Sequence, residues 1–254
     1  MNVFARSIVK SALRDMPKWV PKYGQLELFP QHSAKEAADR FAAYMRDSHV
    51  VGSPRDNVVK PLRLYHATPR QYDAFKVKQT PAFGDTRMKR HAIFASEDPE
   101  YAEEYAKETF GDQYKPGANV LPIYASIRNP LDITDEGLGS IGGHEADRLM
   151  TRGISLDEIA QNEEPYRWHY FDDDLGRKFV GALRNLGYDG VKLKESFGSV
   201  VAPRDPRADR SVDVWAAFDP TQFKSVFNRG SFSAREPHLL KARGGRISSF
   251  KVKR

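Results

Sequence analysis

The stretch that decides the fold lies at residues 212–232 and reads VDVWAAFDPTQFKSVFNRGSF. Its first seven residues are almost all apolar and include Val and Trp, which favours a β-strand. The Asp-Pro pair at 219–220 follows at once and predicts a tight turn over 219–226, because Pro fixes its own φ and Asp bonds to nearby backbone amides. Gln222 and Lys224 are expected to organise this turn.

The segment before this strand predicts a helix that leads into another strand. Asp172 to Asp174 are expected to cap the helix, and Gly187 suits the position just beyond its end, where a left-handed residue is common. The sequence YDGVKLK at 188–194 predicts the strand, and a charged loop follows at 195–211. The apolar face of the helix is formed by Leu175, Phe179, Val180, Leu183 and Leu186.

The rest of the chain alternates short helices and strands without a regular βαβ rhythm, so we expect an α+β fold with a mixed or antiparallel sheet. Asp98 and Pro99 have the pattern of a helix start, and Ser33 and Glu36 have the spacing of a capping box. The sequence RNPLDI at 128–133 is expected to turn the chain away from the sheet. The predicted helices span 34–47 and 99–110, the predicted strands span 62–68, 91–96 and 119–127, and loops with a short helix fill 134–170.

Composition limits the classes of protein that the chain can be. Its 254 residues suffice for a domain with a buried core, and the absence of Cys rules out disulfides, thiolate metal sites and a Cys nucleophile. No apolar run approaches the roughly 18 to 20 residues of a membrane helix, so no membrane partner is expected. The formal charge of +6 favours an anionic partner. We expect a basic arm at 1–32, a domain at 33–236 and a basic tail at 237–254.

Other common site motifs do not fit the predicted elements. No GxGxxG loop follows a predicted strand, and the sequence has no Walker lysine loop, no HExxH helix and no GxSxG elbow. His144 and His169 stand alone in the sequence. We therefore expect no metal site.

Five motifs follow one another along the chain: LYHAT at 64–68, AIFASEDPEYAEEYA at 92–106, VLPIYASIRNPLDI at 120–133, LRNLGYDGVKLKES at 183–196, and the 212–232 stretch. Their order and wording resemble the ADP-ribosyltransferase fold. The likeness is greatest to the ADP-ribosyltransferase-like domain of phage and prophage polyvalent proteins, and it covers roughly residues 41–233. It implies a mixed or antiparallel split sheet with flanking helices.

The resemblance also implies a chemistry and a set of site residues. An ADP-ribosyltransferase binds NAD as its substrate and cleaves the nicotinamide bond through an oxocarbenium-like cation, as in glycoside chemistry. The branch that includes the poly(ADP-ribose) polymerases and diphtheria toxin uses a His, a Tyr and a Glu. The likeness places this His at His66, on the adenosine ribose, with the backbone of Ala67 on the nicotinamide amide and Thr68 in a local hydrogen bond. Taken alone, His66 suits a structural role at a strand end, whereas the other four motifs favour ligand contact.

The second motif implies the aromatic part of the site. Phe94 and Tyr105 align with two aromatic positions and are expected to stack on the nicotinamide ring, while Ser96 lies close enough to contact the ligand. Taken alone, Tyr105 suits core packing on a helix face. The basic loop at 76–91 is expected to lie over the donor. Its cations, expected to meet the pyrophosphate, are Lys76, Lys78, Arg87, Lys89 and Arg90.

The last motif departs from the catalytic pattern. The Glu of the polymerase-like enzymes aligns with Val214. Asp213 is one residue away, which on a regular strand means the opposite face, unless a bulge intervenes. Glu195 is the other candidate acid, and base rates alone make both carboxylates surface residues.

The resulting prediction is an NAD-dependent ADP-ribosyltransferase that modifies a host protein or nucleic acid and releases nicotinamide. The resemblance implies a phage origin and action in the host cytoplasm, with delivery in the virion as one route. Two alternatives stay open. One is a catalytically impaired protein that binds NAD or ADP-ribose, or serves as a virion interaction protein. The other is a nucleic-acid-directed enzyme whose basic ends hold nucleic acid or touch the capsid.

Overall fold

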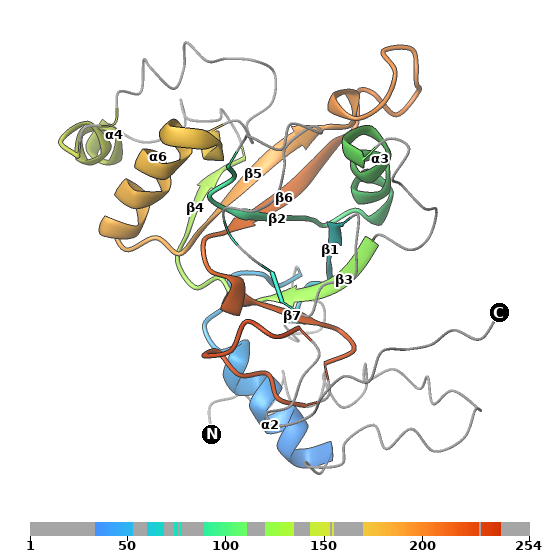
Figure 1. The fold of residues 1–254 in the computed structure, drawn as a ribbon, viewed down its shortest axis with the longest axis vertical. Coiled ribbons are helices and arrows are strands. Elements are labelled where there is room, and N and C mark those ends of the chain that lie inside the picture. Colours follow the sequence, from blue (N-terminus) through green and yellow to red (C-terminus); the bar gives the residue numbers. More distant parts are fainter. Residues whose placement is uncertain are drawn as a thin grey trace.

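A mixed seven-stranded sheet forms the centre of the molecule (Figure 1). The computed structural model describes residues 34–52, 60–68, 74–75, 77, 89–110, 120–134, 143–152, 154, 170–228 and 230–239. In this part of the chain the strand order is β4-β5-β6-β2-β1-β3-β7, and every neighbouring pair is antiparallel except β4 and β5. The strands are β1 (Leu64–Ala67), β2 (Ile93–Ser96), β3 (Val120–Ala125), β4 (Pro130–Ile133), β5 (Gly190–Ser196), β6 (Ser211–Ala217) and β7 (Phe223–Ser225). The α+β class is confirmed.

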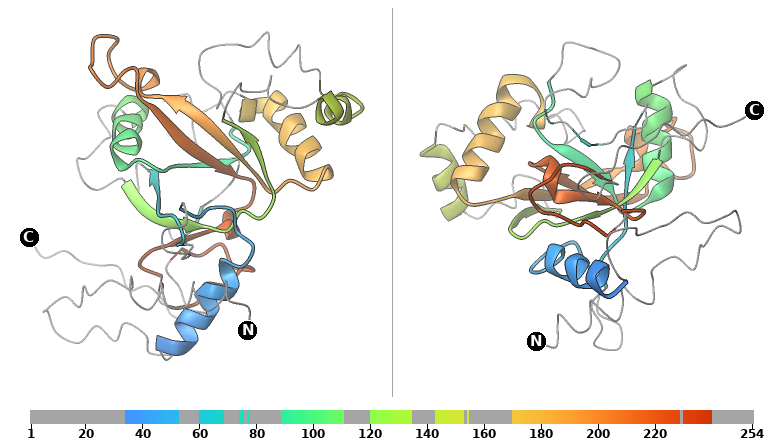
Figure 2. Two further views of the ribbon diagram at one scale, coloured as in Figure 1. Left: turned by 180° about the vertical axis from the view of Figure 1, so that it is seen from behind. Right: turned by 60° about the horizontal axis from the view of Figure 1, so that its bottom comes forward.

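Four helices in the described residues flank this sheet. In Figures 1 and 2, α4 (Gly143–Met150) and α6 (Asp173–Asn185) lie beside β4 and β5, α3 (Pro99–Phe110) lies beside β1, and α2 (Ala34–Tyr44) lies beyond β7. The start of α3 is capped as predicted, because Asp98 Oδ1 accepts the amide of Glu100 at 2.8 Å. The end of α6 is also as predicted, since Gly187 has a φ of 92°.

The two faces of the sheet carry different cores, as strand alternation requires. On β6, Val212, Val214 and Ala216 pack with α6, whereas Trp215 and Ala217 pack with β1 and β3 residues on the other face. The face toward α6 is the larger core and includes Phe171, Phe179 and Leu183 of the described residues. We call it the α6 face, and the other the Trp215 face.

The sheet is weakest between β1 and β2. These two strands share a single register pair, Tyr65 with Ser96, whereas β1 pairs with β3 at four positions. Beyond Tyr65 the two strands diverge, and this opening is where the candidate site lies. The split implied by the family resemblance is therefore present at the centre of a continuous sheet.

Gln222 links the 212–232 stretch to the YDG motif through hydrogen bonds. The Gln222 side chain donates to the backbone oxygen of Asp189 at 2.9 Å and accepts the amide of Asp219 at 2.8 Å. The Asp189 carboxylate in turn accepts the amides of Arg128 and Asn129 at 2.9 and 2.8 Å. These bonds join the YDG and FDPTQ motifs and confirm a structural role for Gln222.

Several local predictions were wrong. Residues 219–226 form a short 3-10 helix (Pro220–Gln222) and β7 rather than one tight turn, because β7 finds β3 as a partner. The helix predicted over 34–47 ends at Tyr44. The Asp172 side chain makes no capping bond at the start of α6, since Arg90 takes both of its oxygens.

The prediction for RNPLDI was also wrong, because β4 joins the sheet as an edge strand, paired in parallel with β5. The sequence GLGSIG at 137–142 therefore follows a strand in the chain and precedes α4, contrary to our expectation for GxGxxG motifs, although its residues lie outside the described part. Also outside it are the arm at 1–32, Ser33, His169 and most of the tail predicted from residue 237.

Candidate functional site

A small pocket opens on the α6 face where β1 and β2 diverge. Its volume is about 60 Å³, and since one water needs about 10–15 Å³ on such a measure, it has room for several waters or one small ring. Seven side chains that carry the argument line it: His66, Arg90, Phe94, Ser96, Tyr101, Tyr105 and Glu195. The pocket thus brings together residues from β1, β2, α3 and β5.

His66 is held as a neutral ring with a defined tautomer. Its Nδ1 lies 2.6 Å from the backbone oxygen of Phe94, which can only accept, so Nδ1 carries the proton and Nε2 is an acceptor. Burial, helped by the nearby charge of Arg90, lowers the pKa of His66 to about 4 against the opposing effect of the hydrogen bond to Phe94. At neutral pH, His66 therefore offers an acceptor nitrogen to a hydroxyl donor.

Phe94 and Tyr105 form the aromatic lining, and Arg90 connects them. Arg90 Nη1 donates to the Tyr105 hydroxyl at 2.8 Å, and its Cζ lies 5.2 Å from the centroid of the Phe94 ring. Phe94 also meets Phe171 edge-on at 5.1 Å. Both rings are thus fixed before any ligand binds, which lowers the entropic cost of binding.

Arg90 makes a buried ion pair with Asp172. The distances are 2.9 Å from Nε to Oδ1 and 3.2 Å from Nη2 to Oδ2, and both side chains are 5% exposed. We expected Arg90 to reach a pyrophosphate from a loop, but the structure places it inside the fold, bonded to the residue that precedes α6. Lys89 precedes it in the chain and donates its amide to Asp173 at 2.9 Å. Lys76, Lys78 and Arg87 lie outside the described residues.

The two candidate carboxylates have different positions. Glu195 is 3% exposed and lines the pocket. Asp213 lies on the Trp215 face, where it pairs with Lys192 at 2.6 Å. The β5–β6 register is regular through Lys194 and Asp213, with no bulge to turn Asp213 inward. Val214 itself lines the pocket, so the position that aligns with the family's Glu does face the site.

The remaining predicted contacts fall partly in the pocket. Ala67 lines it, on the edge of β1 that has no register pair with β2. Ser96 lines it and also accepts the amide of Asp98 at 2.9 Å, which joins β2 to α3. Thr68 is 1% exposed and is not among the lining residues, so the structure does not bring it to the ligand side.

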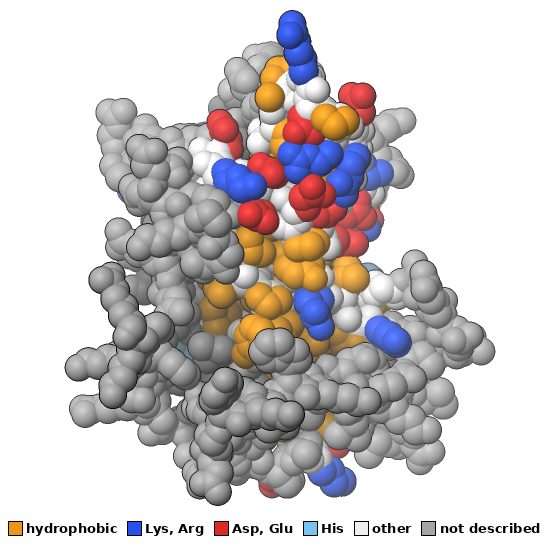
Figure 3. All heavy atoms as spheres, turned by 90° about the vertical axis from the view of Figure 1, so that its right-hand side faces the viewer, with side chains coloured by type: hydrophobic (Ala, Val, Ile, Leu, Met, Phe, Trp, Pro, Cys, Tyr) orange, Lys and Arg blue, Asp and Glu red, His pale blue; other side chains and the backbone are white. Residues whose placement is uncertain are grey.

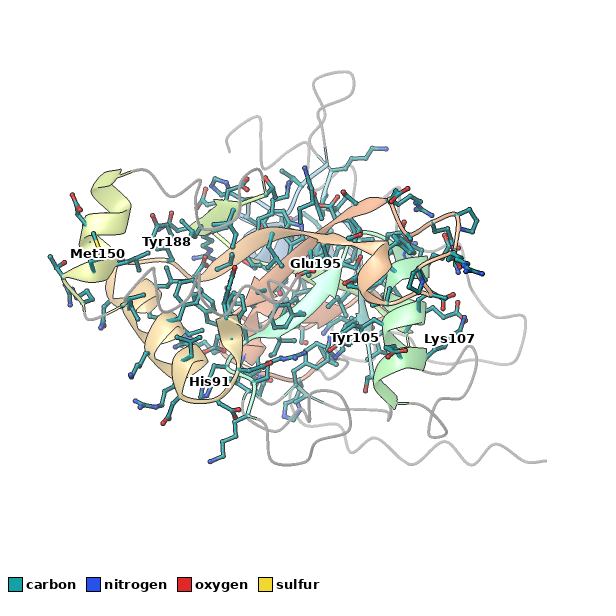
Figure 4. The ribbon with its side chains drawn as sticks, turned by 90° about the horizontal axis from the view of Figure 1, so that it is seen from above. His91, Tyr105, Lys107, Met150, Tyr188 and Glu195 are labelled. Carbon is teal, nitrogen blue, oxygen red and sulfur yellow. The ribbon has the colours of Figure 1, made fainter. Side chains whose placement is uncertain are left out.

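Tyr101 is a pocket residue that the sequence analysis missed. Its hydroxyl lies 3.2 Å from Ser199 Oγ, and burial raises its pKa, with Glu195 as the next cause. Residues four apart on a helix share a face, so the Tyr101–Tyr105 spacing could have revealed it. Figure 4 shows Tyr105 and Glu195 over the sheet, with Lys107 on the outer side of α3.

An ion-pair network holds α3 in place from outside. Arg207 contacts Glu100 and Glu104 at 2.8 and 3.2 Å, and Arg210 contacts Asp98 at 2.6 Å. Figure 3 shows the intermixed basic and acidic side chains gathered over the upper part of this face. The network links the segment after β5, which carries Glu195, to the helix that carries Tyr105.

Two further findings on the described residues concern membrane-spanning helices and metal ligands. No helix there is long and apolar enough to cross a membrane. In the same residues, no three His, Cys, Asp or Glu side chains gather as the ligands of a metal ion would.

The mixed seven-stranded sheet with its flanking helices is the architecture expected of an ADP-ribosyltransferase. A family model described as "ADP-Ribosyltransferase in polyvalent proteins" matches residues 56–232. The chain belongs to this family, which supports a transferase domain. No curated protein and no solved structure gives a significant match.

Proposed function

We propose that this chain transfers ADP-ribose from NAD to a host macromolecule and releases nicotinamide. The observation that carries the proposal is the entry of Glu195 into the pocket that also holds His66, Phe94 and Tyr105. A preorganised carboxylate in a water-poor site stabilises a developing cation far better than it would in water. Cleavage of a glycosidic bond develops such a cation at the anomeric carbon.

Each lining group has a role in this proposal. The nicotinamide ring lies against Phe94 and Tyr105, and its carboxamide meets the backbone of Ala67. The Nε2 acceptor of His66 takes a hydrogen bond from a ribose hydroxyl, which its neutral state allows. Glu195 accepts from the nicotinamide ribose and faces its anomeric carbon. Ser96 borders the ring.

The reaction balances without any further reactant. The bond between the ribose C1′ and the nicotinamide nitrogen breaks, and its electron pair neutralises the pyridinium ring, which leaves as nicotinamide. A nucleophilic oxygen or nitrogen of the acceptor forms a bond to C1′ and loses its proton to Glu195 or to water. The products are the ADP-ribosylated acceptor, nicotinamide and a proton.

The acceptor and the setting are proposed from the family and the charge of the chain. Membership of a polyvalent-protein family supports a phage or prophage source, with action in the host cytoplasm after delivery in the virion. The last 14 residues hold six Lys or Arg and no acid, which supports contact with nucleic acid or capsid. A host protein or nucleic acid is then the acceptor.

A second candidate function is binding without transfer. Val214 occupies the position where the family resemblance expects a Glu, and it lines the pocket. A protein with this substitution retains the rings and His66 for NAD while lacking the family's own acid. The two proposals differ in whether Glu195 replaces that acid.

The test uses purified full-length protein, NAD labelled in its adenosine moiety, and host cell lysate. His66→Ala and Glu195→Gln are compared with Asp213→Asn, a matched carboxylate change on the Trp215 face. Transfer requires label on protein or nucleic acid with the wild type and with Asp213→Asn, and its loss in the other two. The labelled fraction identifies the acceptor class.

Calorimetry with NAD separates the remaining outcomes. NAD binding without transfer or nicotinamide release by the wild type would support the binding protein. Transfer that survives Glu195→Gln would exclude Glu195 as the acid. Neither binding nor transfer would overturn the donor site as a whole.

A further inference from the structure

His66 is held from behind by a phenylalanine that no family motif includes. The rings of His66 and Phe75 lie with centroids 4.5 Å apart in an edge contact, and Phe75 is 5% exposed. The other hold on the imidazole is the bond from Nδ1 to the Phe94 oxygen. The ring is therefore fixed on two sides, which leaves Nε2 for the pocket.

Phe75 is itself held by residues from the end of the domain. It meets the Phe223 ring of β7 edge-on at 5.6 Å. Its neighbour Ala74 forms an isolated antiparallel bridge with His238, and Leu239, which is 1% exposed, belongs to the same core as Phe75. Residues 236–239, which we call the C-terminal strap, thus cover the segment behind His66.

Residues in and just after β7 hold the strap through hydrogen bonds. The oxygen of Leu239 accepts from the Asn228 side-chain amide at 2.8 Å and from the Ser225 amide at 3.2 Å. Lys224 Nζ donates to the oxygen of Glu236 at 2.8 Å. The family match ends at residue 232, so the strap lies outside the matched region.

We infer that Phe75 is a positioning residue for His66 and that the C-terminal strap, through Phe75, sets the affinity of the pocket for NAD. The inference rests on the proposed function for its ligand, whereas the positioning of His66 does not depend on it. Without the strap, Phe75 loses Leu239 and the bridge at Ala74, and the imidazole gains water and rotational freedom on that side. A rotated ring no longer directs Nε2 at a ribose hydroxyl.

The test reads His66 directly, in the full chain, by NMR titration of its imidazole, with His66→Asn to assign the resonance. The pKa of His66 lies at about 4 because the ring is buried, so it reports any solvent gained. The titratable groups that share its pocket are Arg90, Tyr101, Tyr105 and Glu195, and His238 lies in the strap. None of these is altered by the variants.

The variants are Phe75→Leu and Leu239→Ala, with Leu239→Val as the milder change if Leu239→Ala does not fold. The control is Phe41→Leu, because Phe41 is also 5% exposed but lies on α2, where it packs against Tyr124 and Phe232 in a separate cluster. We expect Phe75→Leu and Leu239→Ala to raise the pKa of His66 by about one unit or more and to weaken NAD binding roughly threefold to tenfold. Phe41→Leu should change neither.

Three outcomes decide the matter. An unchanged pKa of His66 in folded Phe75→Leu and Leu239→Val, or an equal shift in Phe41→Leu, would overturn the role inferred for the strap. A raised pKa together with weaker NAD binding supports it. If the variants raise the pKa of His66 but the wild type binds no NAD, the positioning role stands and the proposed function is rejected.

Discussion

Glu195 and Asp213 lie on neighbouring strands of one antiparallel pair, yet they serve different faces of the sheet. Glu195 is 3% exposed among aromatic side chains, whereas the Asp213 side chain is 27% exposed and contacts Lys192. Each face also has its own cation: Arg90 is buried against Asp172, while Lys192 stays partly in solvent. Each face therefore holds an ion pair, but the pair on the α6 face is buried and the pair on the Trp215 face is partly solvated.

This contrast indicates on which face charges interact more strongly. Charges in a water-poor site interact strongly, whereas partly solvated ion pairs contribute little and are screened by salt. Lys192 also lies over the ring of the buried Trp215 at 5.4 Å, while its side chain and that of Asp213 stay 24% and 27% exposed. We expect substitutions of charged residues on the α6 face to have large effects and matched substitutions of charged residues on the Trp215 face to have small ones.

The largest expected effect is the loss of Arg90. Arg90→Met leaves Asp172 as a buried charge without its main partner, which costs about 3–5 kcal/mol of unfolding free energy. Lys192→Met should cost about 1 kcal/mol or less, because its pair with Asp213 is partly solvated. Denaturant unfolding measures both values, and equal losses would contradict the contrast between the faces.

The next effect concerns transfer itself. Glu195→Gln keeps the shape of the side chain but removes the charge, so nicotinamide release should slow by about 10²–10³-fold. Asp213→Asn should stay within about twofold of wild type, since the rates respond only to groups near the reacting carbon. Steady-state release of nicotinamide is the measurement, and a larger loss in Asp213→Asn would place the chemistry on the other face.

The pH dependence of stability tests the burial of His66. Its folded pKa of about 4 lies below the ordinary 6.5, so the unfolded chain binds more protons between these values. Relative to His66→Asn, the wild type should hold its full contribution above pH 6.5 and lose about 3 kcal/mol as the pH falls through 4. Unfolding curves at several pH values measure this difference, and a pH-independent difference would mean that His66 is solvated.

The smallest effect is a partial rescue. Val214→Glu in the Glu195→Gln background returns a carboxylate to the same face, one strand away, and should restore release about tenfold, or about 1.4 kcal/mol. Val212→Glu is the matched control, since Val212 shares this face but does not line the pocket. Rescue by the control alone would reject the pocket geometry.

Much of the fold and part of the site followed from local sequence signals. Asp98, Gly187 and the apolar face of α6 act through neighbours in the chain, so their roles were predictable. The position of Asp213 on the face opposite Val214 also followed from strand alternation, since β6 has a regular register with β5. By contrast, β4 was missed because a four-residue strand depends on its parallel partner β5.

The sequence by itself determined the α+β class, the order of motifs that belongs to the family, and the candidates His66, Phe94 and Tyr105. Only the tertiary structure placed Glu195 in the pocket, moved Arg90 from a loop contact to a buried pair, and placed Phe75 behind His66. The physical reason is the distance along the chain over which each interaction acts. Capping and alternation act over a few residues, whereas burial and ion pairing depend on segments that meet only when the sheet forms.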